Sequence, residues 1–445
     1  MNDVKGLLKS SNWLSGLQWL FFIFTNIVVI PITVGAAFEL PQGKIAGLLQ
    51  LSFIMTGIAC MIQGLFGHKR AIMEGNSGLW WGVILTLCST AVAQGMPLTI
   101  LGGSLTVGVI ISGVLTIIIG VTGLGPHLAK LFNPGVMGVF MFLFGVKLIG
   151  IFLKGMLGIP FGNDAQSATI DLSISLLSII IAIMVIIISI KAPPGVRRYG
   201  LLIGIIIGWI AFNITFGQQE TVEQTASSGI ELFPLGKPAF DIGVIITAVI
   251  AGLLNTANTF GALKGTDSMY GEETTKGQYR RSFTITGIFT GIAGVFGLVP
   301  YAPYVSSIGF LSQTGIIKRL PFILGGFMFF IMGVIPPIGH FFSLLPLSIG
   351  SAVLFVSYLQ LLNSSWYFFK QVEFNTLNVY RSAIPLFVGI IIMTLPLSYF
   401  ATLPDFIRPV ISSGLLVGII LALVLENVFD WDQYGVKKEK AESQA

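Results

Sequence analysis

The sequence predicts an all-α polytopic membrane protein with about fourteen transmembrane segments, two of which are broken by a short extended stretch. Of its 445 residues, 54% are hydrophobic and only 10% are charged, and the mean hydropathy is +0.89. Soluble domains of this length are not so poor in charge. Apolar runs of about 17–25 residues, the length that crosses a bilayer, recur along the whole chain. We place them near residues 13–37, 45–67, 72–94, 99–123, 133–157, 171–191, 200–216, 241–263, 283–299, 301–316, 320–341, 344–366, 382–400 and 406–428.

The basic residues indicate which ends of these segments face the cytoplasm. Most of the 24 Lys and Arg residues fall in alternate loops, together with both chain ends, and cytoplasmic loops are enriched in Lys and Arg. We therefore expect a bacterial inner (plasma) membrane protein with both termini in the cytoplasm. The net charge of +5 follows from this topology. It points to surrounding membrane lipid and not to a nucleic-acid partner.

The first segment, near residues 13–37, is too long for a cleaved signal peptide and lacks a small-residue cleavage site. It carries Gln18 and Asn26, whose amides need partners in hydrocarbon. Asn26 is a candidate substrate ligand, and the alternative is a hydrogen bond between helices. Cys60 and Cys88 lie in later apolar segments. We expect them to be packing residues rather than disulfide partners or metal ligands.

The third and tenth segments are the broken ones. The third contains EGNSGLWWG, residues 74–82, and the tenth contains YAPYVSSIGFLSQTG, residues 301–315. Broken backbone at membrane depth is tolerated only inside protein or beside a wet cavity, which is where transporters bind their substrates. Each break is expected to be a short extended stretch followed by a half-helix. The N-terminus of each half-helix would present free N–H groups near the membrane midplane.

The predicted substrate ligands at the two breaks are backbone N–H groups and small polar side chains. They come from Asn76, Ser77 and Gly78 in the third segment, and from Val305, Ser306, Ser307 and Gly309 in the tenth. The alternative is that these glycines and serines only allow tight helix packing. Pro300 and Pro303, beside the serines, favour the break.

Glu74 is the acidic residue next to a break. A carboxylate at membrane depth can take up and release a proton during transport, so Glu74 is the candidate for ion coupling as well as a candidate substrate ligand. The alternative is an ion pair with Lys69 or Arg70, which lie four or five residues away.

The eighth segment carries Asn255 and Asn258, followed by Thr259, on one helical face. Their amides offer both donors and acceptors, which suits a ring with alternating polar groups. Both asparagines are therefore candidate substrate ligands, and the alternative is again a hydrogen bond between helices.

Similar short sequences recur seven segments apart. Ile100–Gly103 and Ile323–Gly326 both read ILGG, and Pro134 and Pro346 each stand four residues before a glycine. Because seven is odd, the two halves would have opposite orientations in the membrane. This inverted repeat is typical of transporters with alternating access.

Motifs of enzymes and metalloproteins do not occur in the sequence. It contains no phosphate-binding loop, no zinc-ligand spacing and no catalytic triad. We therefore expect a transporter that is not an enzyme and has no cofactor and no metal site.

Three motifs resemble those of the nucleobase–cation symporter-2 family, also called nucleobase–ascorbate transporters. The first segment matches the family at Leu17, Gln18, Pro31 and Gly35, with Trp19 where the family has histidine. Ser306-Ser307-Ile308-Gly309, followed by Thr314, resembles the family signature, and GNSG at residues 75–78 stands where the family has a small-residue motif. The chain departs from the family at two positions. The family has a glutamate where Asn258 stands, and a glutamate or glutamine where Ser306 stands.

The resemblance implies a 7+7 inverted repeat that forms a core domain and a gate domain. Residues 1–124 and 240–341 would form the core domain, residues 125–217 and 342–428 the gate domain, and residues 429–445 a cytoplasmic tail. It also implies a homodimer that carries a nucleobase, such as a purine, xanthine or uracil, with H⁺ or Na⁺. One alternative is an anion transporter of the same fold, of the sulfate or bicarbonate type, because half-helix N-termini suit anions. A passive channel is the other.

Overall fold

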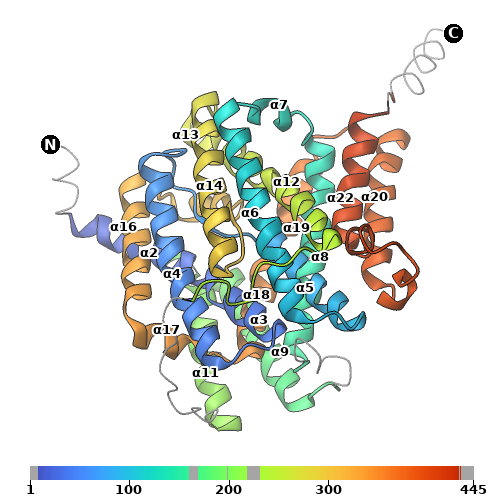
Figure 1. Ribbon diagram of the computed structural model, residues 1–445. Coiled ribbons are helices and arrows are strands. Elements are labelled where there is room, and N and C mark those ends of the chain that lie inside the picture. The colour runs from blue at the N-terminus through green and yellow to red at the C-terminus, as the bar shows by residue number, and fades with distance from the viewer. Residues whose placement is uncertain (1–8, 160–168, 198, 218–230, 430, 432–445) are drawn as a thin grey trace.

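The computed structural model describes residues 9–159, 169–197, 199–217, 231–429 and 431. In these ranges the chain is mostly helical, and it forms a bundle around one pair of three-residue strands (Figure 1). Nearly all of the tail predicted at residues 429–445 lies outside the described residues.

The elements of the first half follow the predicted apolar segments in order. They are α2 (Ser10–Ile27), α3 (Val29–Ala37), α4 (Gln42–Leu65), β1 (Glu74–Asn76), α5 (Gly78–Ala93), α6 (Leu98–Thr122), α7 (Gly125–Ala129), α8 (Pro134–Met156), α9 (Leu172–Lys191), α10 (Pro194–Arg197) and α11 (Gly200–Phe216).

The second half repeats this sequence of one strand among helices. Its elements are α12 (Ile242–Gly265), α13 (Asp267–Tyr270), α14 (Lys276–Phe296), β2 (Tyr301–Pro303), α15 (Ser307–Thr314), α16 (Arg319–Val334), α17 (Pro336–Ser343), α18 (Leu347–Tyr358), α19 (Leu361–Phe369), α20 (Thr376–Thr394), the 3₁₀ helix η2 (Leu397–Phe400), α21 (Arg408–Ile411) and α22 (Gly414–Asn427).

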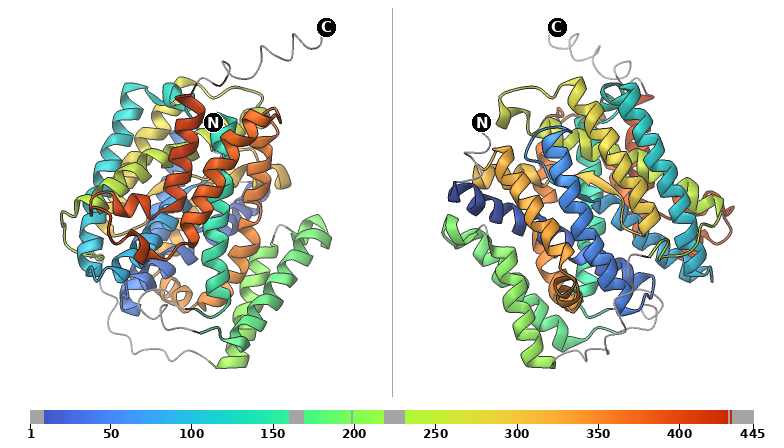
Figure 2. Two further views of the ribbon diagram at one scale, coloured as in Figure 1. Left: turned by 90° about the vertical axis from the view of Figure 1, so that its right-hand side faces the viewer. Right: turned by 60° about the vertical axis from the view of Figure 1, so that its left-hand side comes forward.

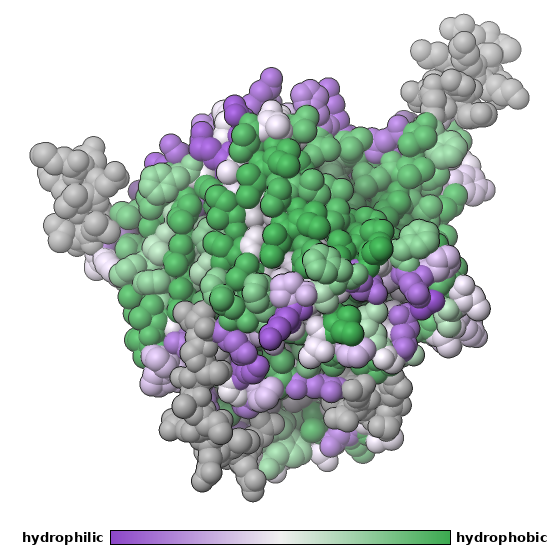
Figure 3. Space-filling model, in the orientation of Figure 1, coloured by the Kyte–Doolittle hydropathy of each residue, from purple (hydrophilic) through white to green (hydrophobic). Residues whose placement is uncertain are grey.

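The protein is a multi-pass membrane protein. Within the described residues, 8 helices are long and apolar enough to cross a membrane, or up to 9 if a bent pair is one span. Three shorter apolar helices, Gly78–Ala93, Gly200–Phe216 and Gly414–Asn427, add to them. Figure 3 shows a broad apolar surface with hydrophilic residues above and below it, as a bilayer requires.

Polar N-caps begin several of the long helices. Asn133 Oδ1 accepts a hydrogen bond from Val136 N at 2.9 Å, and Asp241 Oδ1 accepts one from Val244 N at 2.9 Å. Such caps satisfy N–H groups that the first helical turn leaves without a partner. They explain why α8 and α12 begin directly after these residues.

The helices pack in two groups. In the first, α6 packs against α14 and α12, and α16 packs against α4 and α2. In the second, α8 packs against α18, α19, α20 and α22, and α9 packs against α11 and α18. Figure 2 shows α9 and α11 at one side of the bundle. Small residues allow the closest approaches: a Cβ atom at Gly113 of α6 would lie 2.7 Å from the backbone N of Gly291 on α14.

Both predicted breaks are present, as β1 with α5 and as β2 with α15. The segment predicted at residues 320–341 is divided, because α16 ends at Val334 and α17 begins at Pro336. Pro336 and Pro337 provide no backbone N–H, so the helix cannot continue through them.

Candidate functional site

The two broken segments meet as an antiparallel strand pair. Glu74 lies opposite Pro303, Gly75 opposite Ala302 and Asn76 opposite Tyr301. Backbone hydrogen bonds extend the pair at both ends, from Ser77 N to the carbonyl of Pro300 at 2.7 Å and from Tyr304 N to that of Met73 at 2.8 Å. All six strand residues are buried. The pairing supplies the partners that extended backbone needs away from water.

A half-helix leaves each strand. Ser77 is the N-cap of α5, and its Oγ accepts a hydrogen bond from Trp80 N. Ser306 occupies the N-cap position of α15, and Ser307 is the first residue of that helix. The first N–H groups of each helix, and the positive ends of both helix dipoles, are therefore held beside the strand pair.

Asn255 of α12 braces this arrangement. Its Oδ1 accepts hydrogen bonds from Ser77 Oγ at 2.6 Å and from Asn258 Nδ2 at 3.0 Å. Its Nδ2 donates to the carbonyl of Tyr301 at 2.9 Å. Both ends of this amide are thus used to join α12 to β2 and to the start of α5. Asn258 donates only one N–H here, and its Oδ1 is engaged by no residue that the structure describes.

Glu74 projects from the strand toward α4 and α14, and Asn76 projects toward the chain that joins α14 to β2. Glu74 Oε1 accepts a hydrogen bond from Thr286 Oγ1 at 2.7 Å, and Oε2 accepts one from Gln63 Nε2 at 3.1 Å. Asn76 Nδ2 donates to the carbonyl of Val299 at 2.7 Å. These two side chains share one face of β1, as the period of two requires, and their partners differ from those of Ser77.

Arg70 does not pair with Glu74, so the structure contradicts that alternative. Its Nη1 forms an ion pair with Asp267 at 2.7 Å. Among the described residues, no ion pair includes Glu74. Its carboxyl group is fully buried with two neutral donors.

Tyr304, which is not among the ligands predicted from the sequence, connects several elements. Its hydroxyl group donates to the carbonyl of Asn76 and lies 3.5 Å from that of Asn26. The side chain of Tyr358 on α18 lies beside this hydroxyl group. The Asn26 amide donates to the carbonyl of Phe22 at 2.8 Å, within its own helix. The only sequence signal for Tyr304 was its position inside the second break, directly after β2.

Aromatic rings of the second helix group lie opposite the start of α5. A Cβ atom at Gly78 would lie 2.5 Å from Phe144 Cζ, so the ring rests against the backbone there. Phe144 stacks on Phe140, with ring centroids 5.8 Å apart, and meets Tyr358 edge-on at 6.4 Å. Flat apolar faces therefore lie close to N–H groups, an arrangement that suits a planar polar ligand. Among so many aromatic residues, no sequence pattern distinguishes Phe144 or Tyr358.

Ser306 and Gly309 lie on the open side of α15. Both are exposed, and a Cβ atom at Gly309 would meet nothing within 4 Å. Val305 is buried, with its Cγ2 3.2 Å from the Cβ position of Gly261 on α12. Ser306 and Gly309 thus border open space, whereas Val305 and Ser307 are buried, as are Ser77 and Asn255.

A separate cavity of about 710 Å³ lies between α2, α11, α16 and α17. Its lining includes Phe24, Trp209 and Phe342 and is almost entirely apolar. None of its lining residues belongs to the strand pair or to the half-helices. We therefore place the candidate site at the strand pair and not in this cavity.

Comparison with known proteins identifies relatives along almost the whole chain. The chain is 29% identical to the putative purine permease YwdJ of Bacillus subtilis (strain 168), over 94% of this chain and 96% of that protein. It is 25% identical to the uric acid permease PucJ of the same strain, over 93% and 91% of the two chains. Identity to the xanthine permease of that strain is 22%, over 93% of each chain.

Solved structures of anion transporters have a similar fold. The transmembrane domain of the cyanobacterial bicarbonate transporter BicA aligns with a TM-score of 0.61 at 17% identity, over 93% of this chain and 97% of that chain. The murine anion transporter Slc26a9 in its inward-facing state aligns with a TM-score of 0.60 at 12% identity, over 93% and 68%.

A family model described as "Permease family" (Xan_ur_permease) matches residues 10–398. This range contains both strands, both half-helices, and Asn255 and Asn258 of α12. The chain therefore belongs to this permease family, the nucleobase–cation symporter-2 family, and is a membrane permease rather than an enzyme.

Proposed function

We propose that the protein is a secondary active permease for a nucleobase, with a purine or a related planar heterocycle as its substrate. The observation that carries this proposal is the pair of half-helix N-termini held beside β1 and β2, opposite the rings of Phe144 and Tyr358. A purine has a flat apolar face and an edge of alternating donors and acceptors. The names of the purine, uric acid and xanthine permeases among the relatives support the same substrate class.

The base lies between the two broken segments in this proposal. Within Asn76–Gly78 and Val305–Ser307, the backbone N–H groups other than those of Ser77 and Ser307 donate to its carbonyl oxygens, because helix N-termini favour partial negative charge. The N–H groups of Ser77 and Ser307 already bond to the carbonyls of Pro300 and Tyr304. The free Oδ1 of Asn258 accepts from a ring N–H. The side chains of Ser77 and Asn255 are hydrogen-bonded to each other, so they position the N-terminus of α5. Asn26 lies beside the base, next to the hydroxyl group of Tyr304. Gly309 has no side chain and so leaves room for the base.

Transport then proceeds by alternating access in a fourteen-segment inverted repeat. The first helix group, with both strands, corresponds to the core domain of residues 1–124 and 240–341. The second corresponds to the gate domain of residues 125–217 and 342–428. The core domain moves against the gate domain and exposes the base to either side of the inner membrane. Both termini are cytoplasmic, and the protein acts as a homodimer.

Glu74 couples transport to H⁺ in this proposal. A buried carboxyl group without a basic partner is stable when it carries a proton. Its contacts with Thr286 and Gln63 link it to α14 and α4, and its backbone is part of β1. Protonation can therefore act on the strand without the carboxyl group touching the base.

A second candidate function is anion transport, favoured by the fold similarity to the bicarbonate transporter domain. Uptake of labelled purines into cells that lack their own base transporters separates the two. We expect saturable uptake of at least one purine, inhibited by unlabelled purines and not by bicarbonate or sulfate. Inhibition by the anions alone, or no uptake by a chain shown to reach the membrane, would reject the proposal. Counterflow of preloaded base excludes a passive channel.

A further inference from the structure

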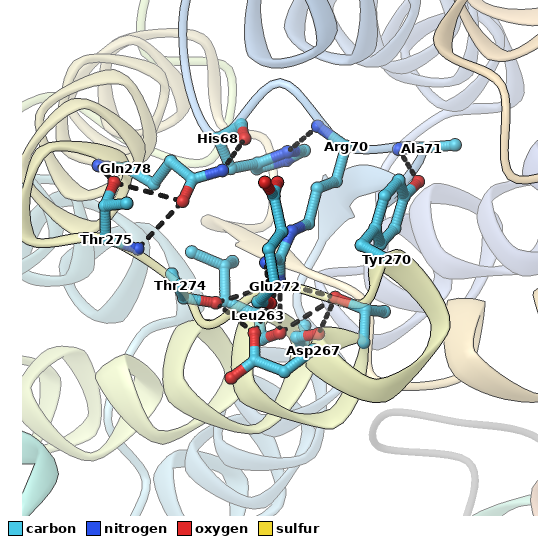
Figure 4. A network of polar contacts seen from close by, with 12 residues as sticks. His68, Arg70, Ala71, Leu263, Asp267, Tyr270, Glu272, Thr274, Thr275 and Gln278 are labelled. Carbon is cyan, nitrogen blue, oxygen red and sulfur yellow. Dashed lines mark hydrogen bonds and ion pairs between the residues drawn. The ribbon is translucent and has the colours of Figure 1, made fainter.

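The chain just before β1 is fastened by a buried arginine (Figure 4). Arg70 is 1% exposed, and its Nη2 donates to the carbonyl of Glu272 at 3.0 Å. Its Nη1 lies 2.7 Å from Asp267 Oδ1 and 2.8 Å from the carbonyl of Leu263. A guanidinium group with its N–H groups directed at carboxylate and carbonyl oxygens has little freedom to move. The loop after α4 is therefore held against the ends of α12 and α13.

Tyr270, the last residue of α13, adds a link to the second broken segment. Its hydroxyl oxygen accepts a hydrogen bond from Ala71 N at 2.8 Å and donates one to the carbonyl of Ile317 at 2.9 Å. Its ring lies under Arg70, with the guanidinium carbon 5.1 Å from the ring centroid. One hydroxyl group thus joins the chain three residues before β1 to the chain three residues after α15.

A histidine holds the same loop from the other side. His68 Nδ1 accepts a hydrogen bond from Arg70 N at 3.1 Å, and the His68 carbonyl accepts one from Gln278 Nε2 at 2.9 Å. Burial, reinforced by the charge of Arg70, lowers the pKa of His68 to about 3. The imidazole is therefore neutral at physiological pH and keeps the lone pair that accepts this bond.

These contacts continue directly into the candidate site. Met73 N, two residues after Ala71, donates to Ser307 Oγ at 3.1 Å. The spacing between β1 and α15 is thus fixed at the strand pair and again at Tyr270. Without the second attachment, α15, a helix of only 8 residues, would be tied to the chain before β1 only at its N-terminal end.

We propose that Tyr270 is a positioning residue for transport. Its hydroxyl group, oriented by Arg70, holds the chain that follows α15 and so keeps this helix in the orientation toward α5 that a bound base requires. We name this group the Tyr270 clasp: Arg70, Ala71, Asp267, Tyr270 and Ile317. The clasp is a property of the fold, whereas its effect on transport rests on the proposed function.

Hydrogen exchange of the purified full chain tests the clasp without a substrate. Tyr270→Phe removes the hydroxyl group and keeps the ring under Arg70. We expect amide exchange to rise about tenfold or more in peptides covering residues 68–76 and 307–318 together. Tyr380→Phe makes the same change at an exposed position of α20 and should leave both peptides unchanged. Unchanged exchange in Tyr270→Phe, or acceleration of one peptide alone, overturns the link.

Uptake kinetics test the positioning role. In Tyr270→Phe we expect the KM for the transported base to rise about tenfold with less than a twofold change in Vmax. Arg70→Lys keeps the charge but loses the planar fork, and it should change KM in the same direction. An unchanged KM in Tyr270→Phe overturns the role. If the wild-type chain carries no base, the proposed function fails, and the exchange experiment still decides whether the clasp exists.

Discussion

At the scale of single residues, the polar side chains at the breaks divide into two sets. Ser77, Asn255 and Asn258 form one hydrogen-bonded group. Glu74 and Asn76 bond instead to α14 and to the chain that follows it. The sequence predicted which residues lie at the breaks, because prolines, glycines and serines interrupt apolar segments. It could not predict the division, since that depends on the strand face toward which each side chain points. It also gave no means of selecting Tyr304 and Phe144 among 10 Tyr and 35 Phe.

The role of Glu74 leads to a prediction about coupling. Glu74→Gln should abolish the dependence of uptake on a pH gradient and lower accumulation about tenfold for each pH unit of gradient, because one proton no longer moves with each base. Binding of the base, measured as a thermal shift of the purified protein, should persist, since the carboxyl group bonds to Thr286 and Gln63. Glu373→Gln, at an exposed position, is the control. Unchanged pH dependence in Glu74→Gln excludes the coupling role.

At the scale of elements, the sequence predicted the two breaks but not the pairing of their strands. Two interrupted segments predicted two half-helices, and α5 and α15 confirm them. The antiparallel register of β1 with β2 joins residues more than 220 positions apart, and no local pattern encodes such a pairing. The division between α16 and α17 at Pro336 was not predicted, because hydropathy does not depend on whether a residue has a backbone N–H.

Gly75 provides a test of the strand pair. A Cβ atom there would lie 2.8 Å from Met73 Cε and 2.9 Å from Ile27 Cδ1. Gly75→Val adds three carbon atoms to this contact and should cost about 1–3 kcal/mol of stability, seen as a lower melting temperature, with reduced uptake. Gly150→Val, on α8 where a Cβ atom meets nothing within 4 Å, should melt close to the wild type. Equal melting temperatures for the two variants would contradict the packing around β1.

At the scale of the whole molecule, the two helix groups touch beside the site. The start of α5 lies against Phe144, and a Cβ atom at Gly82 would lie 3.4 Å from Lys147 Cγ on α8. Composition and basic loops predicted the membrane bundle from the sequence. The contact between α5 and α8 was not predictable, because it depends on how the two groups of helices are placed together.

Alternating access predicts that α5 and α8 separate during transport. The double variant Gly82→Cys, Lys147→Cys should be joined by a short bifunctional thiol reagent with a reducible link. Joining should lower uptake more than tenfold, because a covalent link is far stronger than the contacts that must open, and reduction should restore it. Each single variant treated in the same way is the control. Wild-type uptake by the joined protein would show that this interface stays closed throughout the cycle.

Protection of a single cysteine by substrate tests most directly the claim that the base lies at the strand pair. Ser306 is exposed beside α15, whereas the native Cys60 and Cys88 are 0% and 2% exposed. Ser306→Cys should therefore react with a maleimide that leaves the wild-type chain unlabelled. A purine that inhibits uptake, present at about ten times its Kd, should slow this reaction about tenfold, because it occupies the site. A reaction rate unchanged by any such base would contradict the account.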